Sequence, residues 1–231
     1  GCWRAEREES DHVNYRLSRR GLLSRTGALA ATTLSGPFLG FATRAGSQAT
    51  ARSQDDGLFS LGVASGEPHS DGVVLWTRLA PEPMETGGGM QATPADVAWE
   101  LAVDENMQKV VRRGSAVADP SFAHSVHVEV QGLEPARWYW YRFKAGRELS
   151  PIGRTRTAPK TGAVIDKLRF AVASCQNYQS GYYTAHGHMA GEDLDLVVFL
   201  GDYIYEGGAR EGRTRQHDGP AARTLEDYRR R

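Results

Sequence analysis

Apolar and polar residues alternate through much of residues 58–158, a pattern typical of strands with one buried face. In Ser125-Val126-His127-Val128-Glu129-Val130 the three valines share one face and the polar residues share the other. Turn-forming stretches such as Gly66-Glu67-Pro68 and Gly132 separate the segments. The candidate strands are 58–64, 72–79, 97–104, 110–117, 124–130, 138–144 and 152–156. So many short strands over about a hundred residues predict a β-sandwich.

A stretch near the end of this region resembles the tyrosine corner of fibronectin III-like sandwiches. Leu133-Glu134-Pro135 is followed by Tyr139-Trp140-Tyr141-Arg142-Phe143, and the two segments together carry this resemblance. This narrows the prediction for residues 56–158 to a fibronectin III/Ig-like β-sandwich. The other aromatic residues of this region are interpreted as core, so we expect no chemistry from it.

The pattern changes after Ala158-Pro159-Lys160-Thr161-Gly162, which has the composition of a linker. Residues 168–174 and 194–200 are continuous apolar runs, and residues 181–190 between them favour a helix. Strand, helix and strand form a βαβ unit, and continuous apolar strands are typical of a parallel sheet buried on both faces. We therefore predict that residues 164–231 form the first βαβ part of an α/β domain. Thr224 is the expected cap of a helix that starts there.

The start of the chain has the layout of an export signal. Arg19-Arg20 precedes a weakly apolar run, residues 27–42, and small residues follow at Ala49-Thr50-Ala51. Residues 1–51 are therefore predicted to be a leader and signal peptide for the twin-arginine translocation machinery, with a periplasmic or extracellular mature protein. Polar residues and Pro37 within the run make a stable membrane span a poor interpretation. A disordered basic leader or an anchored helix is the alternative.

Charge and cysteine content narrow the choice of partners. The 231 residues carry a formal net charge of zero, so no global field draws the chain to nucleic acid or to an anionic membrane, and we expect no nucleic-acid-binding patch. Cys2 precedes the signal and is expected to be lost on processing, which leaves Cys175. A single cysteine forms no internal disulfide, so Cys175 is either an inert buried thiol or a chemically used one.

Candidate chemistry gathers where the two apolar strands end. Cys175 follows the first strand, Asp202 follows the second, and Tyr205 lies one turn further on. Carboxyl ends of neighbouring parallel strands meet at one sheet edge. Each residue alone has a structural explanation, as a buried thiol, a Gly-Asp turn or an aromatic cap. Together they are three groups that are anionic as ligands, and such groups converge at low cost only around a cation, with ferric iron the best fit and calcium a companion.

Two motifs make the sequence recognisable. Ser174-Cys175-Gln176-Asn177-Tyr178-Gln179 and Gly201-Asp202-Tyr203-Ile204-Tyr205-Glu206 resemble motifs of the alkaline phosphatase D family (phosphodiesterase/alkaline phosphatase D). Residues 61–68, 74–78 and 224–229 are similar to other segments of that family, so the resemblance covers nearly everything from Arg19 to Arg231. It implies an exported hydrolase of phosphate mono- or diesters that depends on Fe3+ and Ca2+.

The resemblance also implies roles for individual residues. Cys175 and Tyr205 would ligate iron, and Asp202 would act as the catalytic metal bridge between iron and calcium. Apart from the resemblance, Gln176 and Asn177 directly follow Cys175 in sequence and are expected to orient these ligands from the second layer. The family's further ligands would lie beyond Arg231, so residues 1–231 resemble the N-terminal part of a longer protein and are expected to be inactive alone.

Three other interpretations stay open. A purple acid phosphatase-like protein also pairs a fibronectin-like domain with a Gly-Asp-x-x-Tyr turn, but its first strand should end in aspartate where this chain has Cys175. A phospholipase D-type diesterase of the same family is the second. A non-catalytic binding module is the third, if the chain truly ends at Arg231. His186 and His188 receive no catalytic role, because their spacing places them on different faces of a helix.

Overall fold

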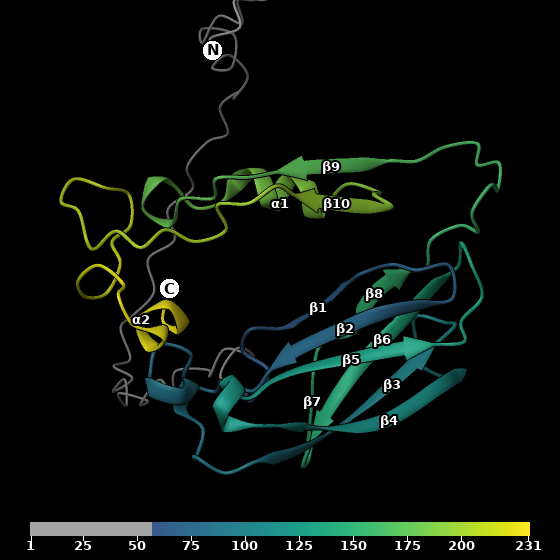
Figure 1. The fold of residues 1–231 in the computed structure, drawn as a ribbon, viewed down its shortest axis with the longest axis horizontal. Coiled ribbons are helices and arrows are strands. Elements are labelled where there is room, and N and C mark those ends of the chain that lie inside the picture. Colours follow the sequence, from purple (N-terminus) through teal and green to yellow (C-terminus); the bar gives the residue numbers. More distant parts are fainter. Residues whose placement is uncertain (1–56) are drawn as a thin grey trace, which may run out of the picture. The chain divides into compact units, whose positions relative to one another are not determined.

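The computed structural model describes residues 57–231, so the predicted export signal and Cys2 lie outside the described residues. Two antiparallel sheets account for most of the regular structure (Figure 1). One sheet has the order β1-β2-β5, and the other has the order β4-β3-β6-β7 with β8 also paired to β6. Their strands are β1 (Val63–Gly66), β2 (Gly72–Arg78), β3 (Ala95–Ala102), β4 (Val110–Ala118), β5 (Ser125–Gln131), β6 (Trp138–Ala145), β7 (Glu148–Leu149) and β8 (Gly153–Arg156). The predominance of β-structure is as predicted.

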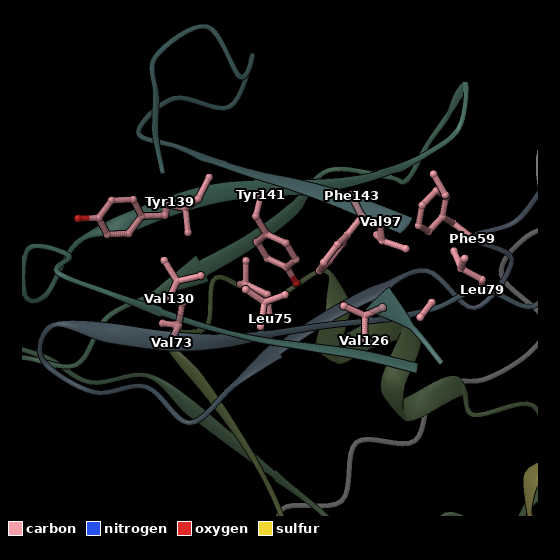
Figure 2. Close-up of a cluster of buried hydrophobic side chains, with 14 of the residues drawn as sticks. Phe59, Val73, Leu75, Leu79, Val97, Val126, Val130, Tyr139, Tyr141 and Phe143 are labelled. Carbon is pink, nitrogen blue, oxygen red and sulfur yellow. The ribbon is translucent and has the colours of Figure 1, made fainter. Parts of the chain in front are cut away.

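One hydrophobic core joins the inner faces of both sheets (Figure 2). The valines of β5 alternate as predicted, with Val126, Val128 and Val130 all buried. Across the core, Tyr141 and Phe143 of β6 meet edge to face with ring centroids 6.2 Å apart. Each fully buried large apolar side chain contributes about 1.5–3 kcal/mol, so this core is sufficient to explain why the two sheets stay together.

The predicted tyrosine corner is confirmed. The backbone N–H of Glu134 donates to the hydroxyl of Tyr139 at 2.8 Å, which ties the connection before β6 to the start of that strand. The first strand differs from the prediction, because residues 58–61 form a turn and β1 begins only at Val63. Hydrogen bonds from Ser60 to Gly57 and from Gly62 to Phe59 close this turn, and Gly62 adopts a left-handed φ of +70° that suits glycine.

The chain beyond the sheets contains the predicted strand–helix–strand order. β9 (Phe170–Ala173) and β10 (Leu196–Phe199) pair in parallel, and α1 (Thr184–Ala190) lies between them in sequence (Figure 1). Burial on both faces was expected of this pair, but Phe170 and Val172 are 56% and 53% exposed in the described part of the chain. The division into domains at 56–158 and 164–231 stays a prediction.

The last helix, α2 (Leu225–Arg229), begins at the predicted cap. Thr224 accepts from the backbone N–H of Asp227, and the Asp227 carboxylate accepts from the backbone N–H of Thr224, which is a complete capping box. Within residues 57–231, no helix is both long enough and apolar enough to cross a bilayer.

Candidate metal centre

Two turns are joined side by side at the carboxyl ends of β9 and β10. The parallel register places Ala173 opposite Phe199, the last residues of the two strands. Backbone hydrogen bonds then continue past the sheet: Cys175 donates to the Gly201 carbonyl and Gln176 to the Asp202 carbonyl, both at 3.2 Å. The sheet register therefore determines which residues of the two turns face each other.

Both turns hold a residue with a side chain in a left-handed backbone conformation. Cys175 has a φ of +55° and Asp202 a φ of +54°, while Gly201 has a φ of +118°. A residue with a β-carbon in such a region costs about 1–3 kcal/mol and persists only where the surrounding structure imposes it. Other non-glycine residues in the described part of the chain share this conformation, so the assignment of chemistry to these two turns depends on the side chains that they present.

The three residues predicted as ligands come together on one oxygen atom. The thiol of Cys175 donates to Oδ2 of Asp202 with an S···O distance of 3.5 Å. The hydroxyl of Tyr205 donates to the same oxygen at 2.9 Å. Cys175 is exposed, so the interpretation of this residue as an inert buried thiol is wrong.

The electrostatics of the cluster favour the protonated form of the Tyr205 phenol. The hydrogen bond to Asp202, with smaller effects from Cys175 and from desolvation, raises the pKa of the Tyr205 phenol well above its ordinary value. A carboxylate that receives two hydrogen bonds on one oxygen occupies the position in which a cation could replace both protons. Sulfur, carboxylate and phenol oxygen together suit iron.

The donor set assembled here is a partial one. No group of three or more His, Cys, Asp and Glu side chains among residues 57–231 is placed to hold a metal ion. The cluster contains only two side chains of these types, Cys175 and Asp202, and its third member is Tyr205. One sulfur, one carboxylate and one phenol oxygen would make up only part of the coordination of a metal ion.

Gln176 links the two turns through its side chain. Its Nε2 donates to the Tyr203 carbonyl at 3.0 Å, and its Oε1 lies 3.0 Å from Nε2 of His186. Asn177, the other residue expected to orient the ligands, uses its Oδ1 to accept from the backbone N–H of Gln179 at 3.0 Å. That bond caps η3, the short 3-10 helix Tyr178–Ser180.

Sequence reasoning missed two residues of this region. Gln179 is 5% exposed; it donates to the Gly208 carbonyl at 3.1 Å and accepts from the Arg210 backbone N–H at 2.9 Å. It thereby fastens the loop after Tyr205 to the turn after Cys175. His186 was interpreted as an ordinary surface or core residue, yet it contacts Gln176. Only the resemblance of the surrounding motif gave a signal for Gln179, and no pattern singled out His186.

Comparisons with known proteins place the chain among the phosphatases. Residues 44–159 match the family described as PhoD-like phosphatase, N-terminal domain, and residues 170–231 match the family described as PhoD-like phosphatase. The chain belongs to the PhoD-like phosphatase family, which confirms the resemblance drawn from the motifs.

Two relatives give the extent of the similarity. The chain is 48% identical over 234 residues to alkaline phosphatase D of Bacillus subtilis (strain 168), which covers 99% of this chain and 40% of that protein. A solved structure of PhoD superposes with a TM-score of 0.74 at 55% identity, over 78% of this chain and 35% of that one. The chain therefore spans well under half the length of the relatives it matches.

Proposed function

We propose that the protein is a metal-dependent hydrolase of phosphate mono- or diesters, of the alkaline phosphatase/phosphodiesterase type. Membership of a phosphatase family supports the reaction class. The observation that carries the assignment of the site is the convergence of the Cys175 thiol and the Tyr205 phenol on Oδ2 of Asp202. Few other arrangements explain why three potential anions should share one position on an exposed edge.

In this proposal Cys175 and Tyr205 would hold Fe3+, and Asp202 would hold both Fe3+ and Ca2+. The Cys175 thiol and the Tyr205 hydroxyl both donate to Oδ2 of Asp202, which brings the three side chains together. Bound iron and calcium would supply Lewis acidity toward a phosphoryl group. As ligands, Cys175 and Tyr205 would be bound without their protons, and Gln176 holds the turn that carries Asp202 and Tyr205 in place.

The proposal also covers where the protein is located and whether residues 1–231 alone are active. Export by the twin-arginine route, to the periplasm or outside the cell, is supported by Arg19-Arg20 and the apolar run after it. The polypeptide 1–231 by itself is proposed to be inactive, because three side chains do not complete the coordination of two cations.

The test uses the protein expressed from its complete reading frame. We expect purified protein to contain iron and calcium and to hydrolyse p-nitrophenyl phosphate or bis(p-nitrophenyl) phosphate. Asp202→Asn should remove both bound metals and activity. Asp166→Asn, which changes an exposed carboxylate before β9, is the matched control and should leave both unchanged. An active preparation free of iron and calcium would overturn the proposal.

A further inference from the structure

A column of planar side chains leads from the loop after Tyr205 to the turn that carries Asp202. Consecutive members are in ring-to-ring contact, stacked or edge-on, or in cation–ring contact. In spatial order the members are His217, Tyr178, Arg215, Tyr183, His186, Phe199 and Tyr203. The column therefore packs side chains from the loop, η3, α1 and β10 against one another.

Arg215 occupies the centre of the outer half. Its guanidinium carbon lies 4.0 Å from the ring centre of Tyr178 and 4.5 Å from that of Tyr183, so the cation is held between two aromatic faces. Its Nε also donates to the Tyr178 carbonyl at 3.0 Å. The ring of His217 stacks on the far side of Tyr178 with centroids 5.0 Å apart. These contacts hold Tyr183 in position.

His186 occupies the inner half. Its ring stacks on Tyr183 with centroids 5.6 Å apart and meets Phe199 edge-on at 6.2 Å. Its Nδ1 is buried and has no hydrogen-bond partner among the described residues. Packing against rings, rather than a second polar contact, therefore fixes the orientation of the imidazole.

Among residues 57–231, the imidazole of His186 has one polar contact, with the side chain of Gln176. Because the Gln176 amide nitrogen donates to the Tyr203 carbonyl, its oxygen must face His186. Nε2 of His186 must then carry the proton and donate it to Gln176. The bonds run from His186 through Gln176 to the carbonyl of Tyr203, the residue that follows Asp202.

We infer that His186 is a positioning residue for the metal-binding turns. The column holds its ring, its N–H orients Gln176, and Gln176 locks the Asp202–Tyr205 turn against the Cys175 turn. The side chains that ligate the metal are thereby arranged before the metal arrives. The inference rests on the proposed function of Cys175, Asp202 and Tyr205 as ligands.

The first experiment needs no metal. In protein from the complete reading frame, stripped of metal, His186→Phe keeps an aromatic ring in the column and removes the donor, whereas His186→Gln keeps a donor near the same place. We expect amide exchange at Cys175 and Gln176 to accelerate about tenfold or more in His186→Phe and to return toward the wild-type rate in His186→Gln. His188→Phe, on an exposed residue of the same helix, is the control. Unchanged exchange in His186→Phe overturns the inference, and so does equal acceleration in both His186 variants.

The second experiment measures metal retention. Loss of an outer-layer partner weakens metal affinity by about 10- to 100-fold, and we expect that loss of iron affinity in His186→Phe but not in His188→Phe. Gln176→Met removes the oxygen that accepts from His186, so it should weaken iron binding to the same extent. The double variant His186→Phe/Gln176→Met should bind iron no more weakly than either single variant. Additive defects overturn the inference.

Iron binding by the wild-type protein distinguishes failure of the proposed function from failure of the role of His186. Wild-type protein that binds no iron defeats the proposed function itself. Wild-type protein that binds iron, together with a His186→Phe variant that binds it equally well, defeats only the role of His186.

Discussion

The hydroxyl of Tyr205 donates a hydrogen bond to Oδ2 of Asp202 across 2.9 Å, three residues back along the chain. The same oxygen accepts from Cys175, which comes from the neighbouring strand end. A local turn and a long-range strand pairing thus converge on one atom. A phenol is protonated at neutral pH, and Asp202 raises the pKa of Tyr205 further, so ligation requires a cation that competes with that proton.

Tyr205→Phe should abolish a colour. Phenolate bound to ferric iron gives a charge-transfer absorption, and Tyr205 is the phenol in the cluster. We expect the iron-loaded protein to absorb in the visible range and the variant to lose that band, with weaker iron binding. Visible spectra at matched iron content check this. Tyr228→Phe, in α2, is the control; a band that persists in Tyr205→Phe would assign the colour elsewhere.

Cys175→Ser should lower iron occupancy without unfolding the sheets. A serine hydroxyl is far harder to deprotonate than a thiol, so it replaces the sulfur poorly as an anionic ligand. Cys175 is exposed and lies outside the core between the sheets, so its loss leaves no cavity there. Metal analysis and the melting curve of the protein measure the two effects separately. Unchanged iron content would return Cys175 to a structural role.

Tyr139→Phe should destabilise the sheets by about 1 kcal/mol. The substitution keeps the buried ring and removes the hydroxyl that accepts from the backbone of Glu134. A single intramolecular hydrogen bond contributes about 0.5–1.5 kcal/mol to stability. Urea unfolding followed by tryptophan fluorescence measures the difference. A variant as stable as wild type would mean that the corner bond is redundant.

Asp227→Asn should change how stability depends on pH. Backbone N–H groups, first that of Arg223 and then that of Thr224, lower the pKa of Asp227 to about 2. Because this pKa lies below the ordinary value of about 3.9, the ionised carboxylate stabilises the folded state above pH 4, and that contribution is lost as pH falls toward 2. Melting temperatures of wild type and variant should therefore differ at pH 6 and converge near pH 2.

Alternation and turn chemistry were sufficient to predict most of the sheets from the sequence. The valines of β5 and the corner at Tyr139 depend on local periodicity and on one nearby hydrogen bond, which is why they could be predicted. The start of β1 could not, because residues 58–61 look apolar but are held in a turn by Gly57 and Gly62. A pattern of hydrophobic residues does not distinguish a buried turn from a strand.

The candidate site was predictable only in part. Its three reactive side chains follow from the rule that parallel strand ends meet, together with the resemblance of the motifs. The partners of His186 depend on Tyr183, Arg215 and other residues brought in from a loop without regular structure. The periodicity of hydrophobic residues in the sequence does not predict such contacts, because they depend on tertiary packing and not on position within a helix.

The left-handed backbone at Cys175 and Asp202 has a consequence for engineering. Glycine at either position would relax the turn and make the metal-free fold more durable, while it deletes the very group that the turn presents. Selection for heat resistance alone would therefore favour glycine at these two positions and remove the groups that they present. A screen for thermostability should therefore also require phosphate release, because otherwise it will enrich stable variants that are inactive.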